Sequence, residues 1–113
     1  MFESLLSKNK YKNITPAQAK TRLESPDVLL LDVRTPPEYA DIHIPKSISL
    51  PLDLLKTKIQ KISPDKDAEI IVYCQSGMRA ATACSQLAAL GYTNVSCMGG
   101  ITAWNYQVER GNI

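Results

Sequence analysis

Residues 70–91 have the sequence IIVYCQSGMRAATACSQLAALG, and this stretch decides the fold of the chain. It opens with a continuous apolar run that ends at Cys74, a pattern typical of a strand buried on both faces of a parallel sheet. A short polar loop follows, and the alanine-rich segment from Arg79 to Leu90 predicts a helix that ends at Gly91. The stretch therefore predicts a strand, a tight loop and a helix in succession, the beginning of a βαβ unit.

Two further apolar runs predict neighbouring strands. The run VLLLDV at 28–33 lacks polar alternation and predicts a second strand buried on both faces. The run NVSCM at 94–98 predicts a third, weaker strand. Because a helix separates the strand at 69–74 from the one at 94–98, these two strands are expected to run parallel.

Four segments outside this unit predict helices. TPAQ at 15–18 and TPPE at 35–38 each place a threonine cap before a proline, with Gln or Glu three residues after the threonine. Residues 52–62 space their leucines and isoleucines by three, four and three positions, which makes one apolar stripe. The closing segment predicts a last helix, because one helical face would carry Ile101, Trp104 and Val108. Alternating strands and helices predict a three-layer α/β domain.

Length and composition limit the classes of function. At 113 residues the chain is expected to form one domain over residues 1–113, since chains this short rarely divide into two cores. A net charge of +2 with scattered charges argues against nucleic acid as a partner. The one lysine-rich stretch is interpreted as a solvated helix face; it comprises Lys56, Lys58 and Lys61.

Location and metal content follow from similar arguments. No apolar run approaches the length of a membrane span, and the opening MFESLLSKNKYKN lacks the features of a signal peptide, so the cytoplasm is the expected location. Three cysteines without C-x-x-C spacing and a single histidine provide no set of zinc ligands. Disulfides, metal and cofactors are therefore not expected, and neither is a membrane partner.

The loop after Cys74 has the features of an anion-binding site around a nucleophile. Loops at the carboxyl ends of parallel strands converge, and a tight loop that enters a helix points successive N–H groups into a small concavity. The positive end of the helix dipole lies behind that concavity and favours the thiolate form of Cys74 over the thiol. Cys74 would then be nucleophilic without a histidine, whereas the alternative is a buried cysteine that merely ends a strand.

Other residues of the segment are assigned by the same reasoning. Gly77 allows a tight bend or a close backbone approach, and Ser76 adds a hydroxyl donor. Arg79 at the helix start opposes the helix dipole, which is easier to explain by an anionic ligand than by helix stability. Cys84 shares an apolar helix face with Ala80 and Leu87, and Cys97 lies within the third strand, so both are predicted to be core residues.

Three separated motifs together resemble a single-domain rhodanese, a sulfurtransferase module: LLLDVRTPPEYADIHIP, IIVYCQSGMRAATACSQLAALGYTNV and MGGITAW. The resemblance runs from about Ile14 to Val108, which would be the core of the domain. It implies a rhodanese-like fold in which a twisted, mostly parallel sheet has helices on both faces.

The resemblance also implies a reaction. The matching Cys74 would take a sulfane sulfur from thiosulfate or from a persulfide such as glutathione persulfide. It would hold this sulfur as a persulfide and pass it to a thiol or cyanide acceptor, including a protein thiol. The anionic outer sulfur would lie among the N–H groups of the substrate-binding loop, formed by Gln75, Ser76, Gly77, Met78 and Arg79.

Residues of the other motifs receive supporting roles by the same resemblance. Asp32 and Arg34 match the family's DVR motif and are expected to brace the site, with Arg34 paired to Glu38. A purely structural ion pair is the alternative. His43 in the HIP motif is interpreted as a loop-packing residue. The MGGITAW motif contributes Trp104 as a packing residue and Gly99-Gly100 as turn positions.

The chain departs from the family at three positions. Ile42 and Lys46 stand where glycines are frequent, which leaves the path of the 42–47 loop open. Gln75 stands where a basic residue is frequent, so fewer charges are available to hold a dianion such as thiosulfate.

Two other functions remain as alternatives. A non-catalytic docking module would use the same fold, although such modules usually lose the cysteine or the arginine, and this chain keeps both. A cysteine-loop phosphatase or arsenate reductase would have five residues between cysteine and arginine, whereas this loop has the four residues 75–78 between Cys74 and Arg79.

Overall fold

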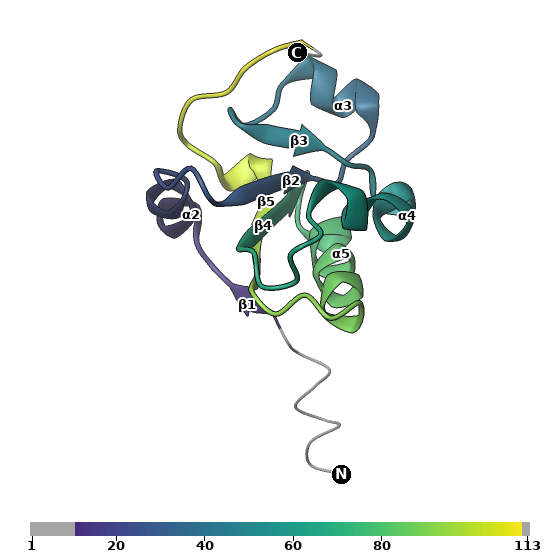
Figure 1. Ribbon diagram of the computed structural model, residues 1–113. Coiled ribbons are helices and arrows are strands. Elements are labelled where there is room, and N and C mark those ends of the chain that lie inside the picture. Colours follow the sequence, from purple (N-terminus) through teal and green to yellow (C-terminus); the bar gives the residue numbers. More distant parts are fainter. Residues whose placement is uncertain (1–10, 112–113) are drawn as a thin grey trace.

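The computed structural model describes residues 11–111, so the first ten residues of the opening segment discussed above lie outside the described part of the chain. Within the described part, none of the helices has the length and apolarity that a membrane span requires. Strands and helices alternate along the chain (Figure 1) in the order β1 (Lys12–Asn13), α2 (Pro16–Arg22), β2 (Leu29–Asp32), α3 (Pro36–Asp41), β3 (Ser47–Ser49), α4 (Leu52–Ile62), β4 (Ile70–Cys74), α5 (Met78–Ala89), β5 (Val95–Gly100) and the 3-10 turn η1 (Ile101–Ala103).

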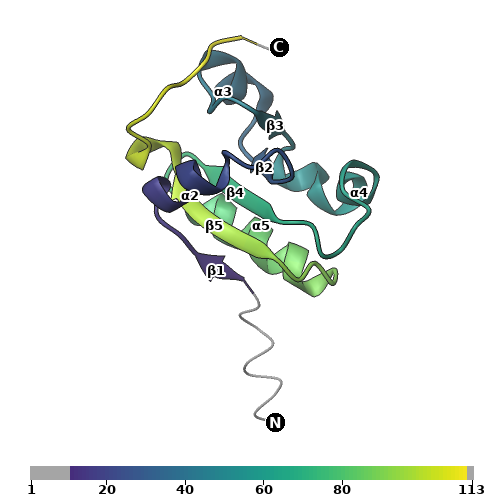
Figure 2. The ribbon, with the colours of Figure 1, turned by 60° about the vertical axis from the view of Figure 1, so that its left-hand side comes forward.

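The strands form one sheet in the order β1-β5-β4-β2-β3, and each neighbouring pair runs parallel (Figure 2). β4 lies at the centre between β2 and β5, where all five of its residues are buried. The three predicted strands are confirmed. Strands β1 and β3 are not predicted from the sequence, because strands of two and three residues leave no periodic signal.

Helices cover both faces of the sheet, which confirms the three-layer α/β fold (Figures 1 and 2). On one face, α4 and α5 pack against the sheet, and their buried residues Leu55, Ile59 and Cys84 join Val72 of β4 in one apolar cluster. On the other face, Ala19 of α2 belongs to a second cluster. The sheet therefore has an apolar core on each side.

The predicted helix starts are confirmed in detail. The Thr15 hydroxyl accepts a hydrogen bond from the Gln18 N–H at 3.1 Å, and the side-chain oxygen Oε1 of Gln18 accepts one from the Thr15 N–H at 2.8 Å. Thr35 and Glu38 form the same reciprocal pair at the start of α3. Helix α4 spans residues 52–62 as predicted, with its lysines exposed; these are Lys56, Lys58 and Lys61.

The closing segment does not form the predicted helix. Only the short turn η1 follows β5, and the chain then extends until Glu109 pairs with the backbone of His43 through two hydrogen bonds of 2.8 Å. Ile101 is buried but Val108 is 39% exposed, so the predicted apolar face does not exist. The N–H and carbonyl groups of Glu109 make their hydrogen bonds with the backbone of His43. These bonds take the place of the hydrogen bonds that a helix would form within the segment.

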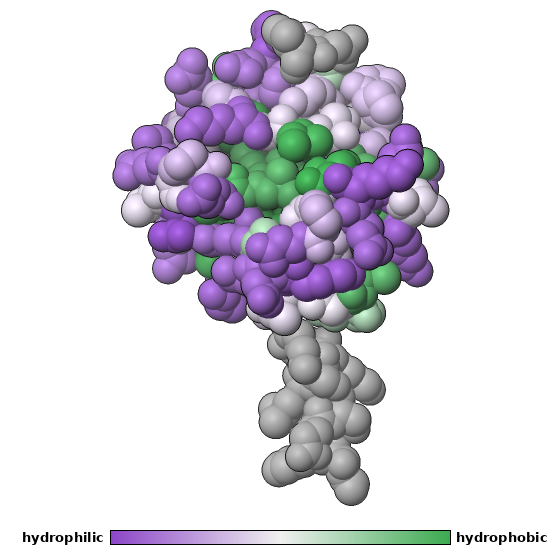
Figure 3. All heavy atoms as spheres, viewed as in Figure 1, coloured by the Kyte–Doolittle hydropathy of each residue, from purple (hydrophilic) through white to green (hydrophobic). Residues whose placement is uncertain are grey.

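Strand β3 forms one edge of the sheet. Figure 3 shows apolar side chains grouped over β2 and β3, inside a ring of polar side chains. Ile48 of β3 contributes to the exposed apolar surface with 40% of its area accessible. A strand of only three residues offers a short edge for pairing with another chain.

Candidate active site

Cys74 is the last residue of the central strand β4, at the carboxyl end of the sheet. Its Cα pairs with Gly100 of β5, and the preceding Tyr73 pairs with Asp32 at the end of β2. The sequence prediction for these two strand ends is thereby confirmed. Side chains and loops from β2, β4 and β5 converge at this point, as they do outside the carboxyl ends of parallel strands in general.

Two main-chain N–H groups point at the sulfur of Cys74. The Gly77 N–H donates to Sγ at 3.0 Å and the Ala80 N–H donates at 3.3 Å. Gly77 precedes α5 with φ = +121°, a backbone conformation that residues other than glycine rarely adopt. The sulfur therefore lies at the positive end of α5, which favours a negative charge on it.

Ala80 is a donor that the sequence analysis did not identify. The expected donors ran from Gln75 to Arg79, and the hydrogen bonds to the sulfur come from Gly77 and from Ala80, one residue beyond that range. The signal was available, because the N–H groups of the first helical turn have no partner within their own helix.

The loop closes over the thiol. Cys74 keeps 1% of its surface accessible, whereas Met78 at the start of α5 is 82% exposed and Ser76 is also exposed. The sequence predicts a thiol that faces a small concavity, and in the structure that thiol is almost completely enclosed. The enclosed sulfur is held by the two N–H groups described above.

Arg34 contacts the Cys74 loop from the interior of the protein and fixes its position. Its guanidinium is 2% exposed and donates to both carboxylate oxygens of Asp32, at 2.7 and 3.1 Å. It also donates to Oε1 of Gln75 at 3.1 Å and to the carbonyl oxygen of Ile42 at 2.7 Å. The expected pairing of Arg34 with Glu38 is wrong, because Nε and Nη2 of Arg34 donate their hydrogen bonds to Asp32.

Glu38 instead binds Arg79. The two side chains form a bidentate ion pair at 2.8 and 3.1 Å, and Glu38 also accepts a hydrogen bond from the Thr35 N–H at the start of α3. The hydrogen bonds from Arg79 lower the pKa of Glu38 to about 2, and the same contact raises the pKa of Arg79. The arginine at the end of the loop is therefore held by a carboxylate from another helix.

Gly100 is a second residue whose importance the sequence analysis missed. Gly99 and Gly100 were expected to form a turn, but both belong to β5. A methyl group on Gly100 would overlap the carbonyl oxygen of Gln75 and lie 2.7 Å from the Cα of Ser76. The Cys74 loop can rest on β5 only because residue 100 has no side chain. The Thr102 N–H adds a hydrogen bond to the Gln75 carbonyl at 3.3 Å.

His43 packs in the loop before β3, as the sequence predicts. Its ring is stacked on Tyr39 with centroids 3.8 Å apart, and Nδ1 lies 2.8 Å from the Tyr39 carbonyl oxygen. The side chain is buried. The 42–47 loop takes its path with Lys46 at φ = +74°, and Nζ of Lys46 donates to the Leu23 carbonyl at 3.2 Å.

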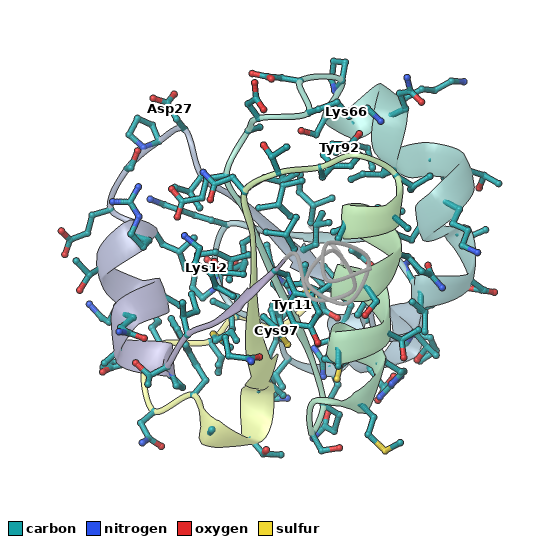
Figure 4. All side chains as sticks on the ribbon, turned by 90° about the horizontal axis from the view of Figure 1, so that it is seen from below. Tyr11, Lys12, Asp27, Lys66, Tyr92 and Cys97 are labelled. Atoms are coloured by element: carbon teal, nitrogen blue, oxygen red, sulfur yellow. The ribbon has the colours of Figure 1, made fainter. Side chains whose placement is uncertain are left out.

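Cys84 and Cys97 are buried, which confirms their predicted place in the core. The hydrogen bond with Cys97 and burial both raise the pKa of the Cys84 thiol. Figure 4 shows Cys97 on β5 with Tyr11 beside it, and Tyr11 packs against the apolar cluster that contains all three cysteines. Cys74 is thus distinguished from the other two by the N–H groups of Gly77 and Ala80 that donate to its sulfur, and not by exposure.

A cavity of about 380 Å³ lies beside Arg79. Its walls come from the loop after β2, the start of α4 and α5, and they comprise Val33, Arg34, Thr35, Pro51, Leu52, Asp53, Arg79 and Gln86. The Oε1 atom of Gln86 is buried without a hydrogen-bond partner among the described residues. A larger cavity of about 570 Å³ includes Lys12 and Glu69 but no residue of the Cys74 loop, so it lies away from the thiol.

Comparison with known proteins gives matches over most of the chain. The family model described as a rhodanese-like domain matches residues 15–107. A protein named sulfurtransferase from Allochromatium vinosum is 42% identical over 82 residues, which cover 72% of this chain and 75% of that protein. A protein named thiosulfate:glutathione sulfurtransferase from Saccharomyces cerevisiae is 40% identical over 86 residues, which cover 66% of this chain and 62% of that protein. A solved structure described as a rhodanese with anions from E. coli has a TM-score of 0.71 and 32% identity, and covers 74% of this chain and 99% of its own.

Proposed function

The chain belongs to the rhodanese-like domain family, and on this basis we propose that it is a sulfurtransferase that carries a sulfane sulfur on Cys74. The observation that carries the proposal is the pair of N–H groups, from Gly77 and Ala80, that donate to Sγ of Cys74. Donors fixed in place before the reaction stabilise a charged sulfur without rearrangement. Relatives whose names include sulfurtransferase give independent support.

The proposed reaction consists of two displacements at sulfur. The Cys74 thiolate attacks the outer sulfur of the donor, an S–S bond to Cys74 forms, and the donor's own S–S bond breaks. Sulfite leaves if the donor is thiosulfate, and a thiolate leaves if the donor is an organic persulfide. An acceptor thiolate or cyanide then attacks the outer sulfur and releases the Cys74 thiolate. Each step transfers one sulfur atom, so no other oxidant or reductant is needed.

The remaining loop residues position this sulfur. Arg34, which is paired with Asp32, donates a hydrogen bond to Gln75, and Ser76 and Met78 form the exposed rim of the loop. Because Cys74 is 1% exposed, a donor reaches it only when that rim moves outward. The added sulfur extends the side chain by about 2 Å, the length of an S–S bond, so the loaded state needs about that much room beyond Sγ.

Mass spectrometry and a transfer assay test the proposal. After incubation with thiosulfate or glutathione persulfide, the intact protein should gain the mass of one sulfur atom, which dithiothreitol removes and which Cys74→Ser does not acquire. Turnover with cyanide or a thiol as acceptor should be lost in the same variant. Cys84→Ser is the matched control and should still acquire the sulfur, because Cys84 lies in the apolar core.

Three outcomes would contradict the proposal. No gain in mass and no turnover with any donor would favour the docking module. Hydrolysis of p-nitrophenyl phosphate that is lost in Cys74→Ser would favour the phosphatase. Sulfur loading that persists in Cys74→Ser would assign the carrier role to another cysteine.

A further inference from the structure

Each of the two arginines beside the Cys74 loop is neutralised by its own carboxylate. Arg34 is paired with Asp32 in the interior, and Arg79 is paired with Glu38 at the mouth of the loop. The three intervening side chains of Gln75, Ser76 and Met78 carry no charge. The side chains around the loop therefore offer a donor little net positive charge, and the attraction for anions comes mainly from the N–H groups.

The candidate donors differ in the charge that they bring next to the reacting sulfur. Thiosulfate is a compact dianion whose sulfonate is bonded directly to the outer sulfur. An organic persulfide has a neutral carbon atom beyond its inner sulfur, and its other charged groups lie farther away. A sulfonate placed beside Arg79 would have to compete with Glu38, which already accepts two hydrogen bonds from that guanidinium.

We infer that Glu38 sets the donor preference of the site, because by holding Arg79 it favours an organic persulfide over thiosulfate. The inference rests on the proposed sulfurtransferase function and adds to it the class of donor. Glu38 acts through Arg79 and is therefore a positioning residue. Its second contact, with the Thr35 N–H at 2.9 Å, fixes the carboxylate at the start of α3 and keeps it aimed at Arg79.

The cavity beside Arg79 gives the organic part of such a donor a place. Its volume is about 380 Å³, and Val33, Pro51 and Leu52 supply apolar wall. Gln86 is in the same lining, and its buried, unpartnered Oε1 would become available to an N–H group of a peptide-like donor once the side chain turns toward the cavity. Thiosulfate, which has no donor hydrogen and no carbon, would use neither feature.

Glu38→Gln tests the inference without dismantling α3. Glutamine keeps the shape and the capping oxygen, as Gln18 does at the start of α2, but it removes the negative charge. Glu69→Gln is the matched control, because Glu69 forms a comparable ion pair with Arg22 at 2.6 Å away from the Cys74 loop. The probes are thiosulfate and glutathione persulfide, with cyanide as the common acceptor.

The expected result is a change in the ratio of the two donors. In Glu38→Gln, kcat/KM for thiosulfate should rise about tenfold, because Arg79 then attracts the sulfonate without competition from a nearby carboxylate. The value for glutathione persulfide should change by less than about threefold, because its carboxylates are several bonds away from the reacting sulfur and solvent screens their contact with the partly exposed Arg79. Wild type and Glu69→Gln should both prefer the persulfide by the same factor.

Equal changes for both donors, or an unchanged ratio in an active Glu38→Gln protein, would overturn the inference. A wild type that prefers thiosulfate would overturn it as well. A second measurement separates it from the proposed function: thiosulfate binding by calorimetry to Cys74→Ser, with and without Glu38→Gln. Tighter binding with Glu38→Gln supports the role of Glu38 even if no turnover is found, a result that would contradict only the sulfurtransferase. Equal binding would contradict the role of Glu38.

Discussion

The loop after Cys74 requires glycine at two positions for different reasons. Gly77 has φ = +121°, and a Cβ there would meet only the backbone of Gly99 at 3.7 Å, so its requirement is conformational. Gly100 has ordinary extended backbone, and its requirement is space, because the backbone of Gln75 and Ser76 lies directly against it. The first requirement could be predicted from a glycine inside a tight loop. The second depends on a strand and a loop that meet only after folding.

Gly100→Ala should reduce both the rate of sulfur transfer and the stability of the protein. The added methyl group must push the backbone of Gln75 and Ser76 away from β5, and a displacement of about 1 Å at a reacting group can lower the rate about 100-fold. The accompanying loss of stability is expected to be about 1–3 kcal/mol, as for other overpacked sites. Transfer rates and urea unfolding of the same preparation measure both quantities.

Gly99→Ala is the control for this prediction. Gly99 has φ = +90° and no heavy atom within 4 Å of an added Cβ, so the variant should lose about 1 kcal/mol through backbone strain alone. Its transfer rate should stay close to that of the wild type. Similar rates in Gly99→Ala and Gly100→Ala would show that the contact between Gly100 and the loop has no role in positioning Cys74.

Arg34 connects the elements that surround the site. From the loop after β2 it reaches the end of β2 through Asp32, the loop after β4 through Gln75 and the loop before β3 through the Ile42 carbonyl. The guanidinium is almost fully buried, so its charge is stabilised by these partners and not by water. One ion pair therefore sets the relative positions of three loops.

Asp32→Asn should destabilise the protein by about 3–5 kcal/mol, the typical loss when one partner of a buried ion pair is removed. The Arg34 charge would remain in the interior beside a neutral amide. Urea unfolding measures the loss, and Asp41→Asn provides the control, because Asp41 and Arg110 form an ion pair at 3.7 Å that is more than three quarters exposed. The control should change stability by about 0.5 kcal/mol or less. A loss below about 1 kcal/mol in Asp32→Asn would contradict the role assigned to the pair.

Local patterns predicted the elements better than their contacts. The capping boxes at Thr15 and Thr35 involve residues three apart, so the sequence contains the whole interaction. The partner of Arg79 could not be predicted in this way, because Glu38 lies 41 residues away and on a different helix. The helix predicted for the closing segment is wrong for a related reason. The spacing of its apolar residues suits a helix, but the backbone of Glu109 pairs with that of His43, which is distant in the sequence.

Two similar glutamate–arginine ion pairs lie at different ends of the sheet. Glu38 with Arg79 lies at the carboxyl ends of the strands, and Glu69 with Arg22 lies just before β4. In both pairs the hydrogen bond from the arginine is the largest cause that lowers the pKa of the glutamate. Both carboxylates therefore bind fewer protons in the folded protein than in the unfolded chain at mildly acidic pH.

This difference in proton binding predicts how stability changes in acid. The pKa of Glu38 is about 2 in the folded protein and 4.5 without partners, so its contribution is complete above about pH 5 and declines as the pH falls toward 2. Because both side chains of the pair are about one third exposed, solvent reduces the contribution to about 1 kcal/mol. Glu38→Gln lacks the titrating group and should be less stable than the wild type at pH 7 by this amount. The two proteins should approach equal stability near pH 2–3. Chemical unfolding at several pH values measures the difference, and a difference that stays constant from pH 7 to pH 3 would show that the charge of Glu38 contributes nothing to folding.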